Sequence, residues 1–220
     1  MTTVIAIDGP SGSGKSTVAR GVAAALGLPV LDTGAMYRAV TLAALDAGVP
    51  LDDAAACATV ARASVITVED GVTMLSGRDV SAEIRGPVVT GAVSTVSAHA
   101  PVREILVAYQ REWVAHHGGG VVEGRDIGTV VFPDATVKVF LVASDEERAR
   151  RRQRDEMAAA RTVAVEDVKA ALDRRDAIDS GRAVSPLRAA DDAIVIDSTR
   201  LDVDTIVAEV IACARAAEAD

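Results

Sequence analysis

A glycine-rich segment near the start of the chain has the residues needed to bind phosphate groups. It reads Gly9-Pro10-Ser11-Gly12-Ser13-Gly14-Lys15-Ser16, which matches the pattern G-x-x-x-x-G-K-S/T in full. A short apolar run precedes it and a stretch with helical spacing follows, as in a P-loop. Glycines let backbone N–H groups surround the phosphates, and the helix adds the positive end of its dipole. We predict that this segment and Thr17 bind ATP, that Lys15 reaches the outer phosphates and that Ser16 holds Mg²⁺.

A P-loop is shared by kinases, switch GTPases and motor ATPases, so other features must separate these classes. The N-K-x-D motif with which common GTPases select their base is absent from the sequence, and 220 residues are few for a motor. These observations favour a kinase. A regulatory protein that uses ATP as a switch, without transferring its phosphate, stays open as a second class.

The arginines indicate what kind of group would accept the phosphate. A hydroxyl acceptor would need a carboxylate base beside it, whereas a phosphate acceptor is already anionic. Two polyanions placed end to end repel each other, so their site requires several converging guanidinium groups. Arginine supplies 20 of the 23 basic residues, and Arg38, Arg125 and Arg182 fall at turns or element ends. We therefore favour an acceptor that carries a phosphate.

Two of these arginines also have a structural interpretation. Arg125 follows a buried strand, at the end where open α/β sheets bind ligands, but it could pair there with Asp126 or Glu123. Arg38 follows a helix start and could be a plain surface residue. The sequence alone leaves both interpretations open.

A run of arginines falls on a predicted helix behind an acidic first turn, and it also has two interpretations. One is a solvated helix with the i,i+4 ion pairs Glu146–Arg150 and Glu147–Arg151. The other is a mobile lid, placed at residues 148–162, that closes over ATP and excludes water. The run comprises Arg148, Arg150, Arg151, Arg152 and Arg154.

Composition and charge limit the possible partners. Apolar residues make up 50% of the chain and aromatic residues only 2%, which predicts an aliphatic core. The formal net charge of −9 opposes binding to duplex nucleic acid. Cys57 and Cys213 fit no disulfide or zinc pattern. Because the sequence shows no leader pattern and no membrane-spanning run, we expect a cytoplasmic protein without membrane partners. We also expect a monomer that acts on small molecules and does not bind nucleic acid.

The apolar pattern predicts an α/β fold. Continuous apolar runs are typical of strands covered on both faces, and stretches with helical spacing separate them. Strands are expected at residues 4–8, 30–31, 121–122, 137–142 and 194–196. Helices are expected at residues 15–26, 34–47, 52–63, 87–99, 101–116, 145–160, 165–178 and 203–217.

Two further segments complete the predicted architecture. Residues 64–80 alternate between apolar and polar and predict an antiparallel hairpin, and Gly118-Gly119-Gly120 predicts a break before the next strand. We expect one domain over residues 1–220, with a parallel sheet flanked by helices, a small mixed insertion and a helical lid. The core is placed at residues 1–33, 104–147 and 163–220, and the insertion at 34–103.

Four segments of the chain resemble bacterial cytidylate kinases, which are nucleoside monophosphate kinases of the P-loop class. They are I-D-G-P-S-G-S-G-K-S at 7–16, L-D-T-G-A-M-Y-R at 31–38, E-G-R-D-I-G-T-V-V-F-P-D-A at 123–135 and D-S-G-R-A-V-S-P-L at 179–187. The resemblance covers nearly the whole chain. It implies a core, an acceptor-binding insertion and a short lid, and the conversion of ATP and CMP or dCMP to ADP and CDP or dCDP with Mg²⁺.

The resemblance also implies roles for individual residues. It places a clamp for the acceptor phosphate on Arg38, Arg125 and Arg182. The cytosine is expected to contact Ser94, Arg103 and Asp126, and the sugar Thr33 and Asp179. The residues expected to be catalytic are Lys15, Arg125 and Arg182.

The chemistry of cytosine agrees with these assignments. Its exocyclic amine donates and suits the Asp126 carboxylate, while N3 and O2 accept and suit Arg103 or Ser94. Uracil carries a carbonyl in place of the amine, so selection against UMP is expected. Thr33 stands where many relatives have serine, which leaves the preference between ribose and deoxyribose open.

Other interpretations remain for several of these residues. Ser94 and Arg103 could be helix-surface residues, and Asp179 could cap a turn before Gly181. A kinase for a hydroxyl acceptor, similar to shikimate kinase, would instead use Asp32 at the end of the second strand. That alternative leaves Asp179, Arg182 and the 123–135 segment without a role.

Overall fold

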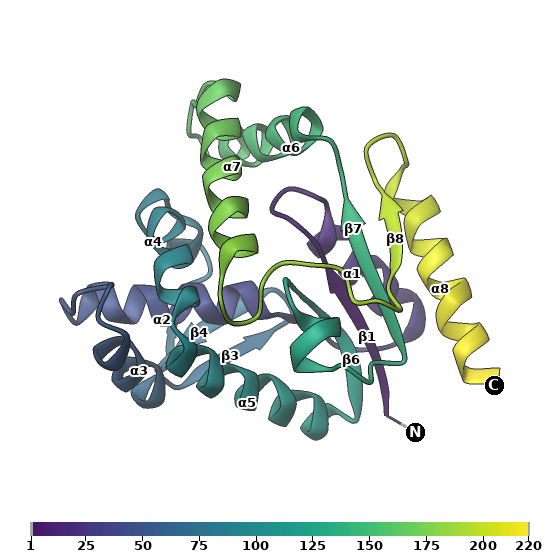
Figure 1. The fold of residues 1–220 in the computed structure, drawn as a ribbon, viewed down its shortest axis with the longest axis horizontal. Helices are drawn as coiled ribbons and strands as arrows, with labels where there is room; N and C mark the ends of the chain where they lie inside the picture. Colours follow the sequence, from purple (N-terminus) through teal and green to yellow (C-terminus); the bar gives the residue numbers. More distant parts are fainter. Residues whose placement is uncertain (1, 220) are drawn as a thin grey trace.

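The computed structural model describes residues 2–219, which form two sheets and eight α-helices (Figure 1). The larger sheet holds β1 (Thr3–Asp8), β2 (Val30–Asp32), β6 (Gly119–Gly124), β7 (Val137–Val142) and β8 (Ile194–Asp197). The smaller sheet holds β3 (Ile66–Glu69), β4 (Val72–Leu75) and β5 (Arg78–Asp79). The helices are α1 (Lys15–Leu26), α2 (Thr33–Asp46), α3 (Ala54–Ala63), α4 (Pro87–Ala98), α5 (Ala100–His117), α6 (Asp145–Ala158), α7 (Val165–Gly181) and α8 (Val203–Ala219).

The larger sheet is parallel throughout, in the order β2-β6-β1-β7-β8. Its register places Asp8 of β1 beside Gly124 of β6, and Asp32 of β2 beside Glu123. The carboxyl ends of these three neighbouring strands therefore meet on one side of the sheet, which is where open α/β sheets bind ligands.

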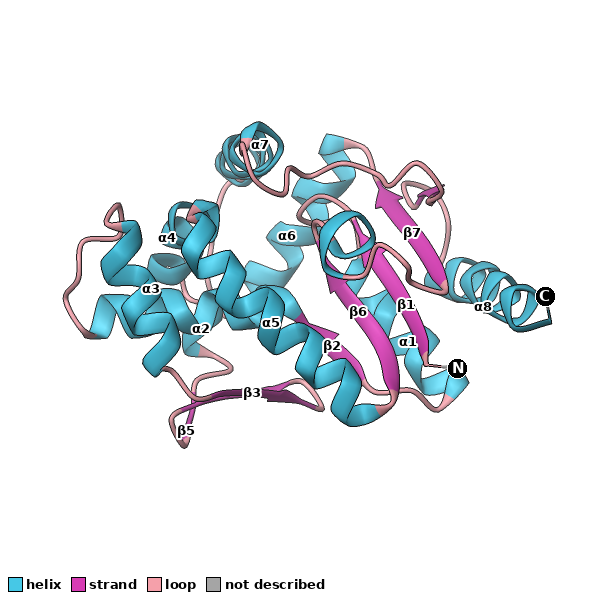
Figure 2. Cartoon of the chain, turned by 60° about the horizontal axis from the view of Figure 1, so that its bottom comes forward, coloured by secondary structure: helices cyan, strands magenta, loops and turns pink. Residues whose placement is uncertain are grey.

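Both faces of β1 and β6 are covered, as the continuous apolar runs predicted, but Val195 of the edge strand β8 is 60% exposed. In β1, Ile5 and Ile7 pack into a core shared with α1 and α8, while Val4 and Ala6 pack into a second core shared with α2, α4 and α5. Figure 2 shows α5 crossing in front of the sheet, with the β3–β5 sheet set apart from it. The predicted α/β architecture is confirmed.

Some local predictions were incomplete or wrong. The predicted hairpin gains a third strand, β5, whose two residues are too few to give an alternating pattern. The predicted break at Gly118-Gly119-Gly120 is shorter than expected: Gly118 ends α5, but Gly119 and Gly120 already belong to β6. Two short helical turns were not predicted: a 3₁₀ turn at Glu83–Arg85 and a π turn at Ile127–Val131. Within residues 2–219, none of the helices combines the length and apolar character needed to cross a bilayer.

The glycine at the start of β6 explains why a glycine run can open a buried strand. Gly119 has a φ of 141°, and a Cβ atom there would lie 2.6 Å from the backbone oxygen of Thr3. Only glycine therefore allows β1 and β6 to pair at this level.

We expect Gly119→Ala to lower the free energy of unfolding by about 3 kcal/mol, because it adds both strain and a backbone clash. Urea denaturation followed by circular dichroism measures this change. The control is Gly91→Ala in α4, where a Cβ meets nothing within 4 Å. It should be neutral or stabilise by up to about 1 kcal/mol through its helix propensity. Equal stability of the two variants would contradict the prediction.

Candidate active site

The glycine-rich loop joins β1 to α1 in a conformation that depends on its glycines. Gly9, Gly12 and Gly14 all have positive φ values, of 147°, 80° and 94°. A Cβ atom at Gly9 would lie 2.1 Å from the backbone oxygen of Leu141, and one at Gly12 would lie 2.9 Å from that of Arg148. The loop is thus packed closely against β7 and α6, and α1 begins directly after it at Lys15.

Lys15 and Ser16 lie at the carboxyl end of β6. The Lys15 ammonium donates to the backbone oxygen of Pro10 at 2.7 Å, so its side chain folds over the loop. The Ser16 hydroxyl donates to Oε2 of Glu123 at 2.8 Å. Burial, together with Arg125, lowers the pKa of Lys15, and burial together with Asp32 raises the pKa of Glu123. The site therefore holds one buried cation and one buried carboxylate close to a hydroxyl.

The other two strand-end carboxylates have structural partners. Asp8 accepts hydrogen bonds from the backbone N–H groups of Ile127 and Gly128, at 2.9 and 2.8 Å. Burial raises its pKa to about 6, against the lowering effect of these two bonds. Asp32 caps α2 by accepting from the Ala35 N–H, and it pairs with Arg85 at 3.0 Å. Both carboxylates therefore have hydrogen-bond or ion-pair partners within the protein.

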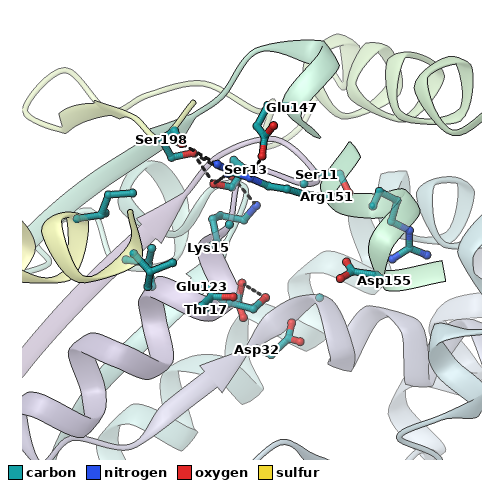
Figure 3. A pocket seen from close by; sticks show the side chains of 18 of the residues that line it. Ser11, Ser13, Lys15, Thr17, Asp32, Glu123, Glu147, Arg151, Asp155 and Ser198 are labelled. Atoms are coloured by element: carbon teal, nitrogen blue, oxygen red, sulfur yellow. Dashed lines mark hydrogen bonds and ion pairs between the residues drawn. The ribbon is translucent and has the colours of Figure 1, made fainter. Parts of the chain in front are cut away.

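A cavity of about 670 Å³ opens between the P-loop, β6, α6 and α7. Figure 3 shows Lys15 with Ser13 and Arg151 on one side and Glu123 and Asp32 on the other. Its lining is rich in guanidinium groups, namely those of Arg38, Arg85, Arg125, Arg151, Arg152, Arg154 and Arg175. This concentration of donors is typical of a site for a polyanion.

The guanidinium groups of this cavity repel one another. Burial and nearby arginines lower the pKa of Arg38 to about 9 and that of Arg175 to about 10. Arg38 is only 7% exposed and donates to the backbone oxygen of Ile84 and the hydroxyl of Thr90, each at 2.8 Å. It is therefore not a plain surface residue. A bound anion would relieve this repulsion.

Arg125 and Arg182 share a buried carboxylate. Nε of Arg125 donates to Asp179 at 3.1 Å, and Arg182 lies 3.2 Å from the other oxygen of the same side chain. Arg125 thus pairs with Asp179, rather than with Asp126 or Glu123. Arg182 also donates to the backbone oxygen of Ser97 at 3.4 Å, which connects α7 to α4. Of these residues, only Arg125 lines the cavity.

The residues predicted to contact cytosine form a second buried group behind the cavity wall. Arg103 and Asp126 make an ion pair of 2.5 Å, and both are almost fully buried. The Arg103 guanidinium lies over the Tyr37 ring, 5.2 Å from its centre, and donates to the backbone oxygen of Ser97. Ser94 is buried one turn before Ser97 on α4. Arg103 and Ser94 are therefore not helix-surface residues.

Thr33 lies on the other side of this group, at the start of α2. Its hydroxyl donates to the backbone oxygen of Glu123 at 2.7 Å. This bond holds the start of α2 against the end of β6. The predicted sugar contacts, Thr33 and Asp179, thus both have partners within the protein.

The arginines of the run at residues 148–154 do not all have the same surroundings: some contact the P-loop and others are exposed. Arg148 donates to the backbone oxygen of Ser11 at 3.2 Å, and Arg151 donates to that of Ser13 at 3.2 Å. Arg150 is exposed. The predicted Glu147–Arg151 pair is present at 3.0 Å. The helix is therefore neither simply solvated nor separate from the P-loop.

Three residues that contact the P-loop or line the cavity were not predicted to have a functional role: Glu123, Arg175 and Asp176. Glu123 was a candidate only for an ion pair with Arg125, although a carboxylate in an apolar strand is itself a signal. Arg175 and Asp176 lie in a helix full of charges, where no local pattern separates them from their neighbours. Only their position in the fold distinguishes them.

We expect Arg175→Met to stabilise the ligand-free protein by about 1 kcal/mol, because it removes a half-buried cation that Arg125 repels. Its carboxylate neighbour Asp179, 3.9 Å away, keeps Arg125 and Arg182 as partners. The rise in Tm on adding inorganic tripolyphosphate should shrink at the same time, since one anion-binding group is lost. Differential scanning fluorimetry measures both effects. Arg174→Met is the matched control, because Arg174 is the exposed neighbour on α7. A destabilised Arg175→Met with an undiminished Tm rise would contradict the prediction.

Comparison with known proteins places this arrangement in a family. The family model "Cytidylate kinase" matches residues 5–216. The cytidylate kinase of Mycobacterium avium (strain 104) is 55% identical over 200 residues, which cover 89% of this chain and 88% of that protein. That of Nocardia farcinica (strain IFM 10152) is 50% identical over 210 residues, which cover 94% of this chain and 90% of that protein.

The solved structures give a more distant likeness. A gluconokinase from Sinorhizobium meliloti 1021 matches with a TM-score of 0.50 over 99% of this chain and 95% of that one. At 17% sequence identity, this match supports the fold alone. With its P-loop, its arginine-lined cavity and its two close relatives, the chain belongs to the cytidylate kinase family and is a phosphotransferase.

Proposed function

We propose that this protein transfers the terminal phosphoryl group of ATP directly to the phosphate of CMP or dCMP, with Mg²⁺, forming ADP and CDP or dCDP. The observation that carries this proposal is that the P-loop, Arg38 and Arg125 line the same cavity. One end of the cavity suits the phosphates of a donor, and the other suits the phosphate of an acceptor. Residues 34–103 would supply the acceptor side and residues 148–162 a lid.

The P-loop fits a nucleotide polyphosphate. Its three positive-φ glycines allow a backbone path that other residues rarely adopt, and this path lets N–H groups of the loop approach phosphate oxygens. Lys15 would move from the oxygen of Pro10 to the outer phosphates. Ser16 would hold Mg²⁺, and the nearby Glu123 carboxylate adds the hard oxygen donor that this ion prefers. The ion would neutralise part of the phosphate charge.

The acceptor needs no general base. A phosphate oxygen of CMP is anionic near neutral pH, so it can attack the terminal phosphorus as the bond to the bridging oxygen of ADP breaks. Lys15, Arg125 and Arg182 would stabilise the charge that spreads over the transferred group, and Arg38 would hold the acceptor phosphate. The buried position of Arg38 and the ion pair of Arg125 with Asp179 fix two of these groups before ligands bind.

The Arg103–Asp126 pair would recognise the base. It presents donors next to an acceptor, which complements the accepting N3 and O2 of cytosine next to its donating amine. Ser94 would complete these contacts, and Thr33 and Asp179 would contact the sugar. Because none of these five residues lines the cavity, acceptor binding requires the cavity to extend past the bond between Arg182 and Ser97.

The kinase for a hydroxyl acceptor is the weaker alternative. Its base would be Asp32, but that carboxylate caps α2 and pairs with Arg85. The clustered arginines would also face no second phosphate in such an enzyme. The cavity thus offers several cations to a second phosphate, which a hydroxyl acceptor would not need.

A coupled assay of ADP release across several acceptors tests the proposed function. We expect turnover with CMP and dCMP that requires Mg²⁺, and kcat/KM at least about tenfold lower with UMP or AMP, because Asp126 faces a carbonyl in UMP. Shikimate should give no release. Strong release with shikimate, or release that needs no acceptor, would contradict the proposal.

We expect Arg125→Met to lower kcat by about 100-fold, because a donor to the transferred group is lost. The affinity for ATP, measured by calorimetry, should fall far less. Asp179 keeps Arg182 as a partner, so the fold should persist. Arg62→Met, at an exposed arginine on α3, is the control. Equal losses of kcat and ATP affinity would reject this role.

A further inference from the structure

The P-loop is held from outside the cavity by two charged side chains. Nη1 of Arg148, on α6, donates to the backbone oxygen of Ser11 at 3.2 Å. The backbone N–H of Ser11 donates to Oδ1 of Asp176, on α7, at 3.4 Å. Arg148 and Asp176 also form an ion pair with each other. The backbone N–H and the backbone oxygen of Ser11 therefore both form hydrogen bonds with the two members of one ion pair.

This ion pair is buried and does not line the cavity. The side chain of Arg148 is 7% exposed and that of Asp176 is 17% exposed. A second ion pair, with Asp145 at 2.5 Å, fixes the other end of the Arg148 guanidinium. Neither Arg148 nor Asp176 belongs to the described residues that surround the cavity. They contact the loop and not the space that a ligand would fill.

The physical need for such a pair follows from the shape of a P-loop. A loop that turns its N–H groups towards phosphates turns its carbonyl oxygens the other way, and buried carbonyls require donors. Arg148 supplies a donor to the oxygen of Ser11. The oxygen of Ser13 receives a bond from the hydroxyl of Ser198 at 2.9 Å, as well as the bond from Arg151. Charged donors hold such oxygens more firmly than neutral ones.

The close approach at Gly12 adds a second observation. The backbone oxygen of Arg148 would lie 2.9 Å from a Cβ at Gly12, so α6 touches the loop directly beside Ser11. The loop residues Ser11 and Gly12 are thus confined by one turn of α6 and by Asp176. Without the ion pair, the backbone N–H and the backbone oxygen of Ser11 would both lose these hydrogen-bond partners.

We propose that Arg148 and Asp176 are positioning residues for the donor nucleotide, which act through Ser11 and do not touch ATP. The proposal rests on the proposed function, because it takes the P-loop as the ATP site. It replaces the lid interpretation for Arg148. The pair fixes the loop in the conformation that ATP binds, so its loss should affect the donor and not the acceptor.

The test compares Arg148→Met and Asp176→Asn with the wild type. Calorimetry measures the binding of Mg·ATP to protein without CMP, and steady-state kinetics gives the KM for CMP. We expect about tenfold weaker ATP binding in each variant. Arg148→Met removes the donor to the oxygen of Ser11, and Asp176→Asn removes the negative charge that holds both Arg148 and the Ser11 N–H. The KM for CMP should stay the same. The double variant should lose little more than either single variant, because the two residues act as one unit.

Arg174→Met is the matched control, since Arg174 is exposed on α7, the helix that carries Asp176. It should bind ATP like the wild type. Unchanged ATP binding in folded Asp176→Asn, or equal losses for ATP and CMP, would overturn the proposal. If Arg148→Met does not fold, Asp176→Asn alone decides, because it keeps the size of the side chain. Because ATP binding is measured directly, a wild type that binds ATP but does not phosphorylate CMP would refute the proposed function and not this inference.

Discussion

Repulsion among positive charges in one cavity is the constraint on which the rest of this structure depends. Lys15, Arg38, Arg125 and Arg175 lie close enough to influence one another, and burial together with neighbouring arginines lowers the pKa of Arg38 and Arg175. A folded protein tolerates such a group only if other elements hold each cation in place. The repulsion lowers the stability of the ligand-free protein, and bound polyanions would relieve it. Such a compromise between stability and function is expected of a binding site.

Carboxylates hold these cations from behind. Asp179 fixes Arg125 and Arg182, Glu123 lies beside Lys15, and Asp126 fixes Arg103. All of them come from the carboxyl end of β6 or from α7. The parallel sheet therefore does more than provide a core, because its register brings these side chains to the edge where the P-loop starts.

Helix α7 connects the two halves of the cavity. Asp176 contacts the P-loop at Ser11, Arg175 lines the cavity, and Asp179 holds the arginines on the acceptor side. These three residues lie within about one helical turn. A shift of α7 would thus change the support of the donor loop and of the acceptor arginines together. In Figure 1 this helix stands between α4 and the loop after β1, which agrees with that role.

The sequence by itself determined the P-loop, the parallel α/β fold and the family, because each depends on patterns that are local in the chain. A P-loop needs glycines at fixed spacing, and a covered strand needs a continuous apolar run. Both can be recognised from residues that are adjacent in the sequence. Only the tertiary structure decided which charged groups meet. Ser16 and Glu123 are 107 residues apart in the chain, and Ser11 and Asp176 are 165 apart. Whether such side chains meet depends on strand register and helix packing, which no local pattern records. For the same reason only the structure separated the buried Arg148 from the exposed Arg150, two positions apart in the same arginine run.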